Sequence, residues 1–220
     1  NEGVVTDKQA RVSECVSNLT FDFKAGDFFQ NNPYTLPLLV SHVIQHATSG
    51  EGIEPRCTNL IDAYCGSGLF ALAASTHFEK VVGVETSATA VQWAQKNAAS
   101  NQITNTHFYA GSAESIFDKV PFSGVVTSLI LDPPRKGCDM RFLRQLIQYA
   151  PRRIIYVSCR AETLARDLAL IVGAGYVLRH VQPFDMFPQT RHIENVATLS
   201  WPGPGAPMPV FSDAARNIRH

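Results

Sequence analysis

From Thr58 onward the chain alternates between short runs of aliphatic or β-branched residues and longer segments with amphipathic helical spacing. A short apolar run bounded by polar turns predicts a buried strand. Apolar positions three or four residues apart predict a helix with one buried face. Strands and helices in alternation are typical of a parallel sheet covered on both faces. The pattern therefore predicts an α/β fold for most of the chain.

The individual elements follow from the same pattern. The predicted strands lie at 59–65, 80–86, 106–111, 126–132, 152–158, 176–184 and 195–201. The predicted helices lie at 69–76, 87–101, 113–118, 139–149 and 162–172. Because no helical segment separates the last two strands, we expect the last strand to run antiparallel as a hairpin partner.

The two ends of the chain differ from this middle part. Apolar positions between 36 and 47 have helical spacing and predict a further helix packed beside the sheet. Residues 1–20 lack such a pattern, and the chain begins with Asn1, so we expect a remnant of an upstream region there. Residues 201–220 form a proline-rich tail in which little regular structure is expected.

Composition and charge restrict the class of protein. Hydrophobic residues make up 45% and charged residues 17%, which is ordinary for a globular chain. Lysine plus arginine equal aspartate plus glutamate at 19 each, so any contact with RNA must come from local basic patches. No run approaches the roughly 18 apolar residues that a membrane span needs, so no membrane partner is expected.

The five cysteines are odd in number and form no CxxC pair. This arrangement argues against a disulfide framework and against a zinc cluster, so no metal is expected. Unpaired cysteines fit a reducing, intracellular compartment, a condition that cytoplasm, nucleus and mitochondrion all satisfy. We also expect the chain to be a monomer.

Polar residues gather where the predicted strands end. Open α/β sheets bind ligands beyond the carboxyl ends of their strands. The candidates at this edge are Asp62, Tyr64, Gly66, Glu85, Ser112 or Glu114, Asp132 and Cys159. An antiparallel last strand would begin at the same edge, which brings Glu194 there as well. One edge of the sheet is therefore the predicted site.

The segment "DAYCGSGLF" forms a glycine-rich connection from the first strand into a helix, where a ligand can approach the backbone closely. Glu85 follows Gly66 by 19 residues, the spacing at which an acidic side chain grips ribose hydroxyls. The third glycine of the dinucleotide fingerprint is missing, because Ala71 stands in its place. The glycine-rich turn and Glu85 together indicate a nucleoside cofactor, and the missing third glycine favours one without phosphates, such as S-adenosylmethionine. For the glycines alone, a tight turn without a ligand is the alternative.

Two further segments carry candidate chemistry. In "LDPPRKG", two prolines after Asp132 hold an extended lip that could brace a planar base or the cofactor, and Arg135 and Lys136 could reach phosphate. The alternative is a turn with solvated charges. Cys159 directly precedes a helix, so the positive helix end and Arg160 should favour a nucleophilic thiolate. The other four cysteines are predicted to be packing residues, which is also the alternative for Cys159.

These segments, together with "FFQNN", "VSCRAETLARDL" and "PQTRHIENVATL", occur in order over residues 20–200. The combination resembles the RNA uracil-C5 methyltransferase family, which makes 5-methyluridine in tRNA and rRNA. "AGDFFQNNPYTLP" is most similar to the eukaryotic, particularly fungal, tRNA branch. The resemblance implies a Rossmann-like class I methyltransferase fold: a seven-stranded, mostly parallel sheet with an antiparallel last strand and helices on both faces. It also implies that residues 21–200 are the S-adenosylmethionine-dependent catalytic domain.

The resemblance implies specific roles. The cofactor-binding residues would be Gln30, Tyr64, Gly66, Glu85 and Asp132, with Cys159 as nucleophile and Glu194 as base. The implied reaction methylates C5 of a uridine in RNA, with the tRNA T loop as the expected target, through a covalent bond between Cys159 and C6. His192 could assist, and Phe29, Phe184 and Phe187 could stack on the base. Relatives carry an upstream RNA-binding region, so we expect this chain to bind tRNA poorly by itself.

Two positions depart from the family pattern. Arg160-Ala161 replaces the common Asn-Pro after the cysteine, and Leu69 stands where many bacterial relatives have asparagine. The first departure puts in question the shape of the loop after Cys159, and the second puts in question one hydrogen bond to the cofactor. A DNA cytosine-C5 methyltransferase would carry a Pro-Cys pair where this chain has Asp132-Pro133-Pro134. The remaining alternatives are a methyltransferase fold with another substrate, and a module that only binds cofactor or RNA.

Overall fold

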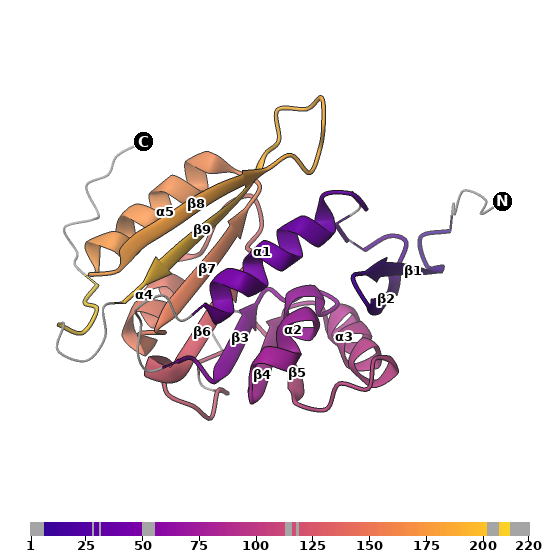
Figure 1. Ribbon diagram of the computed structural model, residues 1–220, viewed down its shortest axis with the longest axis horizontal. Helices are drawn as coiled ribbons and strands as arrows, with labels where there is room; N and C mark the ends of the chain where they lie inside the picture. The colour runs from indigo at the N-terminus through magenta and orange to yellow at the C-terminus, as the bar shows by residue number, and fades with distance from the viewer. Residues whose placement is uncertain are drawn as a thin grey trace.

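The computed structural model describes residues 7–27, 29–30, 32–49, 56–112, 116–117, 119–201 and 207–211. Its centre is a seven-stranded sheet in the order β5-β4-β3-β6-β7-β9-β8 (Figure 1). The strands are β3 (Asn59–Ala63), β4 (Lys80–Glu85), β5 (Thr106–Ala110), β6 (Thr127–Leu131), β7 (Arg153–Ser158), β8 (Val177–Phe184) and β9 (Glu194–Ser200). All seven predicted strands are present, and the α/β fold is confirmed.

The last strand runs antiparallel, as predicted. β9 pairs antiparallel with both β8 and β7, so it is inserted between them, whereas β3, β4, β5, β6 and β7 pair in parallel with one another. β3, β6 and β7 are buried along their whole length because helices cover both faces. The insertion of β9 beside β7 brings the first residue of β9 next to the end of β7.

The helices form two layers. On one face lie α1 (Leu36–Thr48), α2 (Leu69–Ala74) and α3 (Ala88–Ser100); on the other lie α4 (Met140–Tyr149) and α5 (Ala161–Gly173). Successive strand residues alternate between these layers, so that Leu60 packs with the first and Ile61 with the second. Most of the predicted helix at 113–118 lies outside the described residues, as does Glu114. No helix in the described ranges combines the length and apolarity needed to cross a membrane.

A hairpin of β1 (Arg11–Val16) and β2 (Leu19–Lys24) precedes α1, where the sequence pattern predicted no strands. Two asparagines of the α3 region hold it. The Asn97 side chain accepts from the Asp22 amide (2.8 Å) and donates to its carbonyl (3.1 Å), and Asn101 bonds both backbone groups of Thr20. The two side-chain amides thus bond backbone groups of β2 in the way that a neighbouring strand would. The predicted boundary between residues 20 and 21 falls inside β2, and the domain limits remain predictions.

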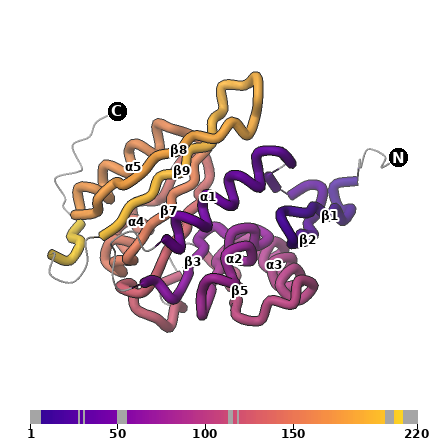
Figure 2. The backbone as a smooth tube through the Cα atoms, viewed as in Figure 1, coloured from indigo at the N-terminus to yellow at the C-terminus, as the bar shows by residue number. Residues whose placement is uncertain are grey.

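The segment before α1 is tied to the connection between β8 and β9. Asn32 donates to the Met186 carbonyl (3.1 Å), and Thr35 donates to the Asp185 carbonyl (3.4 Å). The tube in Figure 2 shows this connection projecting beyond the sheet, near the start of α1. Both segments therefore reach the edge where the parallel strands end.

Candidate active site

A pocket of about 730 Å³ opens at the carboxyl edge of the parallel strands. We call it the active-site pocket. All seven residues predicted for the site line it: Gln30, Tyr64, Gly66, Glu85, Asp132, Cys159 and Glu194. Ser112, Leu69, Phe70, Trp93, Arg135, Lys136 and His192 are among its other lining residues. The structure therefore brings the predicted residues together, whereas their chemical roles remain predictions.

The glycine-rich turn after β3 depends on unusual backbone angles. Tyr64, Gly66 and Gly68 have φ values of 66°, 53° and 94°, in the left-handed region that favours glycine. Asp62 holds the turn, because its carboxylate accepts a hydrogen bond from the Ala71 amide in α2 (2.8 Å). Burial raises the pKa of Asp62 to about 8, and Asp132 and Glu85 add to this effect. Asp62 is fully buried and positions the turn rather than lining the pocket.

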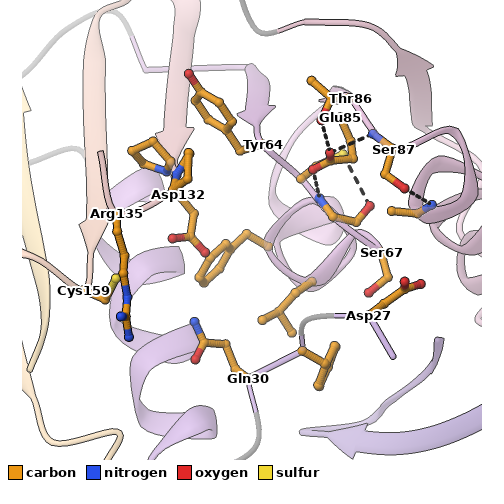
Figure 3. Close-up of a pocket in the computed structure, with 18 of the residues that line it drawn as sticks. Asp27, Gln30, Tyr64, Ser67, Glu85, Thr86, Ser87, Asp132, Arg135 and Cys159 are labelled. Carbon is orange, nitrogen blue, oxygen red and sulfur yellow. Dashed lines mark hydrogen bonds between the residues drawn. The ribbon is translucent and has the colours of Figure 1, made fainter. Parts of the chain in front are cut away.

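Glu85 ends β4 on the side of the pocket opposite Cys159 (Figure 3). One carboxylate oxygen accepts from the Gly66 amide (3.2 Å), and the other accepts from the Thr86 hydroxyl (2.8 Å) and the Ser87 amide (2.9 Å). These bonds fix the carboxylate against the glycine-rich turn. Three of the carboxylate's roughly four acceptor sites are thus used, and one at Oε2 is left for a hydroxyl of a ligand.

Gln30 reaches the pocket from the segment between the hairpin and α1. Its side chain is 5% exposed, and its oxygen Oε1 has no hydrogen-bond partner among the described residues. In Figure 3 it lies on the same side as Cys159. A buried, unsatisfied amide oxygen is costly unless a ligand pairs with it. Gln30 therefore marks a position where the pocket fits a polar ligand group.

The lip that runs from Asp132 to Asp139 is fixed on α5. The Asp167 carboxylate accepts from the Cys138 amide (2.8 Å) and the Tyr156 hydroxyl (2.6 Å), and Thr163 donates to the Arg135 carbonyl (3.2 Å). Gly137 is required here, because its φ is 76° and a Cβ atom would lie 2.7 Å from Asp167 Oδ2. The lip thereby brings Arg135 to Cys159.

Cys159 and Glu194 are neighbours across two strands. The antiparallel register pairs Ser158 of β7 with Asn195 of β9, so the next residue on each side places Cys159 opposite Glu194. The Ser158 hydroxyl accepts from the Arg160 amide (3.2 Å) and stabilises the bend that presents the sulfur. Glu194 is 2% exposed, whereas Cys159 is half-buried.

Arg160 does not activate the thiol as predicted, whereas the contribution of the helix end stays a prediction. Burial and the Glu194 charge raise the pKa of Cys159, while a hydrogen bond and the charge of Arg135 lower it. The Arg160 side chain instead bonds Glu162 at 3.4 Å on the surface. Arg160 was the sequence candidate because it is adjacent in the chain, whereas Arg135 comes from the lip through packing. Because burial is the largest of these influences, the thiol form of Cys159 is favoured.

Both carboxyl groups near the thiol are also shifted. Burial and the Asp132 charge raise the pKa of Glu194 to about 8, and burial raises the pKa of Asp132 to about 7. Like charges that are close together and poorly solvated cannot easily ionise together. This edge of the pocket consequently favours neutral side chains until positive charge enters it.

The three phenylalanines that were predicted to stack on the base occupy different environments. Phe187 and Phe29 line the pocket, but Phe29 stacks on Phe23 with ring centroids 4.3 Å apart, and Phe184 packs in the core instead.

Leu69, at the family's asparagine position, is a buried lining residue. Cys65 and Cys138 are buried, as expected of packing residues. Cys15 is exposed, so its prediction as a packing residue is wrong: it lies on the outer face of a two-stranded hairpin.

Comparisons with known proteins agree with this geometry. The family model described as tRNA (Uracil-5-)-methyltransferase matches residues 15–201. The tRNA (uracil(54)-C(5))-methyltransferases of Saccharomyces cerevisiae and Schizosaccharomyces pombe are each 42% identical, over 89% and 90% of this chain. These alignments cover only 32% and 38% of the yeast proteins, so the chain spans about a third of their length.

A solved structure is similar as well. The Pyrococcus abyssi tRNA (uracil-54, C5)-methyltransferase, crystallised in complex with S-adenosyl-L-homocysteine, superposes with a TM-score of 0.71 at 28% identity. The match covers 86% of this chain and 44% of the archaeal one. The resemblance read from the sequence motifs is confirmed. The chain belongs to the tRNA (uracil-5-)-methyltransferase family.

Proposed function

We propose that the chain transfers a methyl group from S-adenosylmethionine to C5 of a uridine in tRNA. The observation that carries this proposal is the placement of Cys159 opposite Glu194 at one side of a pocket whose other side holds Glu85. The yeast and archaeal relatives are named for uracil 54, so the uridine of the T loop is the proposed target.

The pocket fits S-adenosylmethionine in several respects. The fixed Glu85 carboxylate keeps an acceptor site that suits a ribose hydroxyl, and the unsatisfied Gln30 oxygen suits a donor group of the ligand. The turn at Gly66 leaves the backbone open to a ligand, because no atom lies within 4 Å of where a Cβ would stand. When bound, S-adenosylmethionine supplies a methyl group that is electrophilic because it is attached to a sulfonium.

The Cys159 sulfur would serve as the nucleophile. C5 of uracil is too weak a nucleophile to accept a methyl group unaided, and addition of a thiolate at C6 converts C5 into an enolate-like carbon. Arg135 supports the required thiolate, because its guanidinium charge and hydrogen bond lower the pKa of the thiol.

The Glu194 carboxylate would serve as the base. After C5 has received its methyl group it still carries a proton, and this proton must leave before the bond between sulfur and C6 can break. Glu194 is opposite Cys159, and its pKa of about 8 is high enough to make it a strong carboxylate base once ionised. Loss of the proton restores the ring double bond as Cys159 departs.

The substrate would have to be extruded from its RNA loop. The reacting carbon lies within the base stack, and unstacking one base costs a few kcal/mol. The exposed side chains of Arg135 and Lys136 stand on the lip at the pocket, where they can contact phosphates of the flanking backbone. The formal net charge of zero supplies no broader attraction, so the chain alone should bind tRNA weakly.

Release of tritium from tRNA labelled at C5 of uridine tests the proposal. With S-adenosylmethionine present, the chain should release tritium from a transcript with a uridine at T-loop position 54 and should not release it when that uridine is replaced by cytidine. Cys159→Ser should abolish release, whereas Cys15→Ser, which alters an exposed cysteine on the hairpin, should not. Release that persists in Cys159→Ser would overturn the assignment, and no release by a folded, cofactor-binding chain would favour a binding module.

A further inference from the structure

We propose that His42, His46 and His180 form a binding site for one zinc ion that links α1 to the edge strand β8. The nitrogen atoms that these three side chains can offer as ligands all lie within 4.8 Å of one another. None of the three residues is among those that line the active-site pocket. The site is therefore separate from the proposed methyl transfer and independent of it.

The fold places the three imidazoles together from two elements. His42 and His46 are four residues apart on α1 and so project from the same face of the helix. Their ring centroids are 4.2 Å apart, and the His180 ring lies 5.5 Å from His42 and 5.0 Å from His46. β8 has a register irregularity between Leu178 and His180, the kind of bulge that re-aims a side chain.

The donor chemistry suits a zinc ion. His42 Nε2 is buried and has no hydrogen-bond partner among the described residues, so its lone pair or proton is unsatisfied. A neutral imidazole binds metals through a ring nitrogen, so the side chains of His42, His46 and His180 can each offer one ligand atom. Three histidines with an open fourth position are an established ligand set for zinc, and imidazole is a preferred donor for such ions.

The geometry requires only a small closure. Zinc–nitrogen bonds of about 2.0–2.1 Å in a tetrahedron place the ligand nitrogens about 3.3 Å apart. Rotations of the histidine rings on α1 and β8 can bring the nitrogens from their present separations of up to 4.8 Å to this distance.

Arg153, a cation near the end of α1, donates to the His46 carbonyl (2.6 Å) and the Ser49 hydroxyl (2.8 Å). Its charge is thus held by backbone and hydroxyl oxygens at the carboxyl end of the helix.

A bound ion would act on the structure around the active-site pocket. Asn32 and Thr35, at the start of α1, bond the carbonyls of Met186 and Asp185 in the connection after β8. That connection continues to Phe187 and His192, which line the pocket. A zinc ion between α1 and β8 would join the same two elements a second time and reduce their relative motion.

Zinc titration of the metal-free chain tests the site. The chain is treated with a chelator, dialysed and titrated with zinc chloride by calorimetry near neutral pH, and its melting temperature is followed in parallel. We expect one ion per chain and a higher melting temperature, because a ligand of the folded state stabilises it. His46→Ala and His180→Ala should each weaken binding at least about tenfold and remove the gain in melting temperature. His77→Ala, which alters an exposed histidine after α2, should behave as the parent chain does.

Cysteines are the competing ligands, so each protein is also tested with Cys159→Ser. Histidine-dependent binding that persists in the Cys159→Ser background supports the site. Equal zinc affinity in the parent, His46→Ala and His180→Ala proteins, or no stoichiometric binding by the folded parent, would overturn it. Far-UV circular dichroism verifies that each variant is folded, and His180→Gln replaces any alanine variant that is not.

Discussion

Cys159 stands opposite Glu194 because β9 is inserted antiparallel between β7 and β8, with Ser158 paired to Asn195. Thirty-five positions separate the two residues along the chain, and the strand register makes them direct neighbours. The thiol therefore titrates beside a buried carboxyl group whose own pKa is raised to about 8.

Glu194→Gln should trap the reaction after methylation. The glutamine keeps the size of the side chain but cannot accept the C5 proton, so the bond between Cys159 and the base should persist. Turnover should fall by about 10² to 10⁴, the usual contribution of a general base. Denaturing gels should show a covalent complex with ordinary tRNA, measured beside Glu162→Gln, which alters an exposed carboxylate. Unchanged turnover would exclude Glu194 as the base.

The same substitution should stabilise the fold at high pH. The pKa of Glu194 rises from 4.5 to about 8 on folding, so the folded state holds a proton that the unfolded state loses between these values. This contribution is fully present below the unfolded pKa and is lost as pH rises through about 8. Urea unfolding should therefore show Glu194→Gln more stable than the parent by roughly 1–3 kcal/mol near pH 9, and little different near pH 5. Equal stability at both pH values would contradict the burial effect.

Arg135 should control the reactivity of Cys159. Its hydrogen bond and charge lower the pKa of the thiol, so Arg135→Gln should move the pH midpoint of alkylation by iodoacetamide upward. Arg160→Gln is the matched control, since that arginine pairs with Glu162 on the surface. Peptide mass spectrometry gives the rate at Cys159 alone. A larger effect from Arg160 than from Arg135 would restore the explanation predicted from the sequence.

The hairpin should be needed for cofactor binding. Asn97→Ala removes the bonds to both backbone groups of Asp22 and to the Ser67 carbonyl, leaving buried polar groups unpaired at a cost of about 1–3 kcal/mol. Because β2 leads to Gln30, affinity for S-adenosylmethionine measured by calorimetry should fall as well. Asn101→Ala, whose bonds to Thr20 are more exposed, should have a smaller effect on both quantities. The reverse order would argue against this anchoring.

The sequence predicted the features that local pattern determines. The buried strands, the glycine-rich turn at Gly66 and the carboxylate at Glu85 follow from apolar runs, positive φ angles and strand ends. The antiparallel last strand followed from the missing helix, and this placed Glu194 at the correct edge. These inferences succeed because each depends on neighbours that are close along the chain.

Features built from distant segments were missed. The β1–β2 hairpin was missed although Leu19–Lys24 alternates apolar and polar residues, a local strand signal that was overlooked. The asparagine amides from α3 that hold the hairpin are a contact that no local pattern reveals. Adjacency in the chain favoured Arg160 as the partner of Cys159, whereas the lip delivers Arg135. The three histidines were missed because cysteine spacing alone informed the expectation of no metal, and His180 comes from another element.

A covalent complex with tRNA that contains 5-fluorouridine tests the central claim most directly. Fluorine at C5 cannot be removed as a proton is, so a methylated base should stay attached to the nucleophile. With S-adenosylmethionine present, mass spectrometry of the digested complex should find the nucleotide on the peptide that contains Cys159, with one added methyl group. A methylated product without any covalent complex, or attachment at another cysteine, would contradict the account.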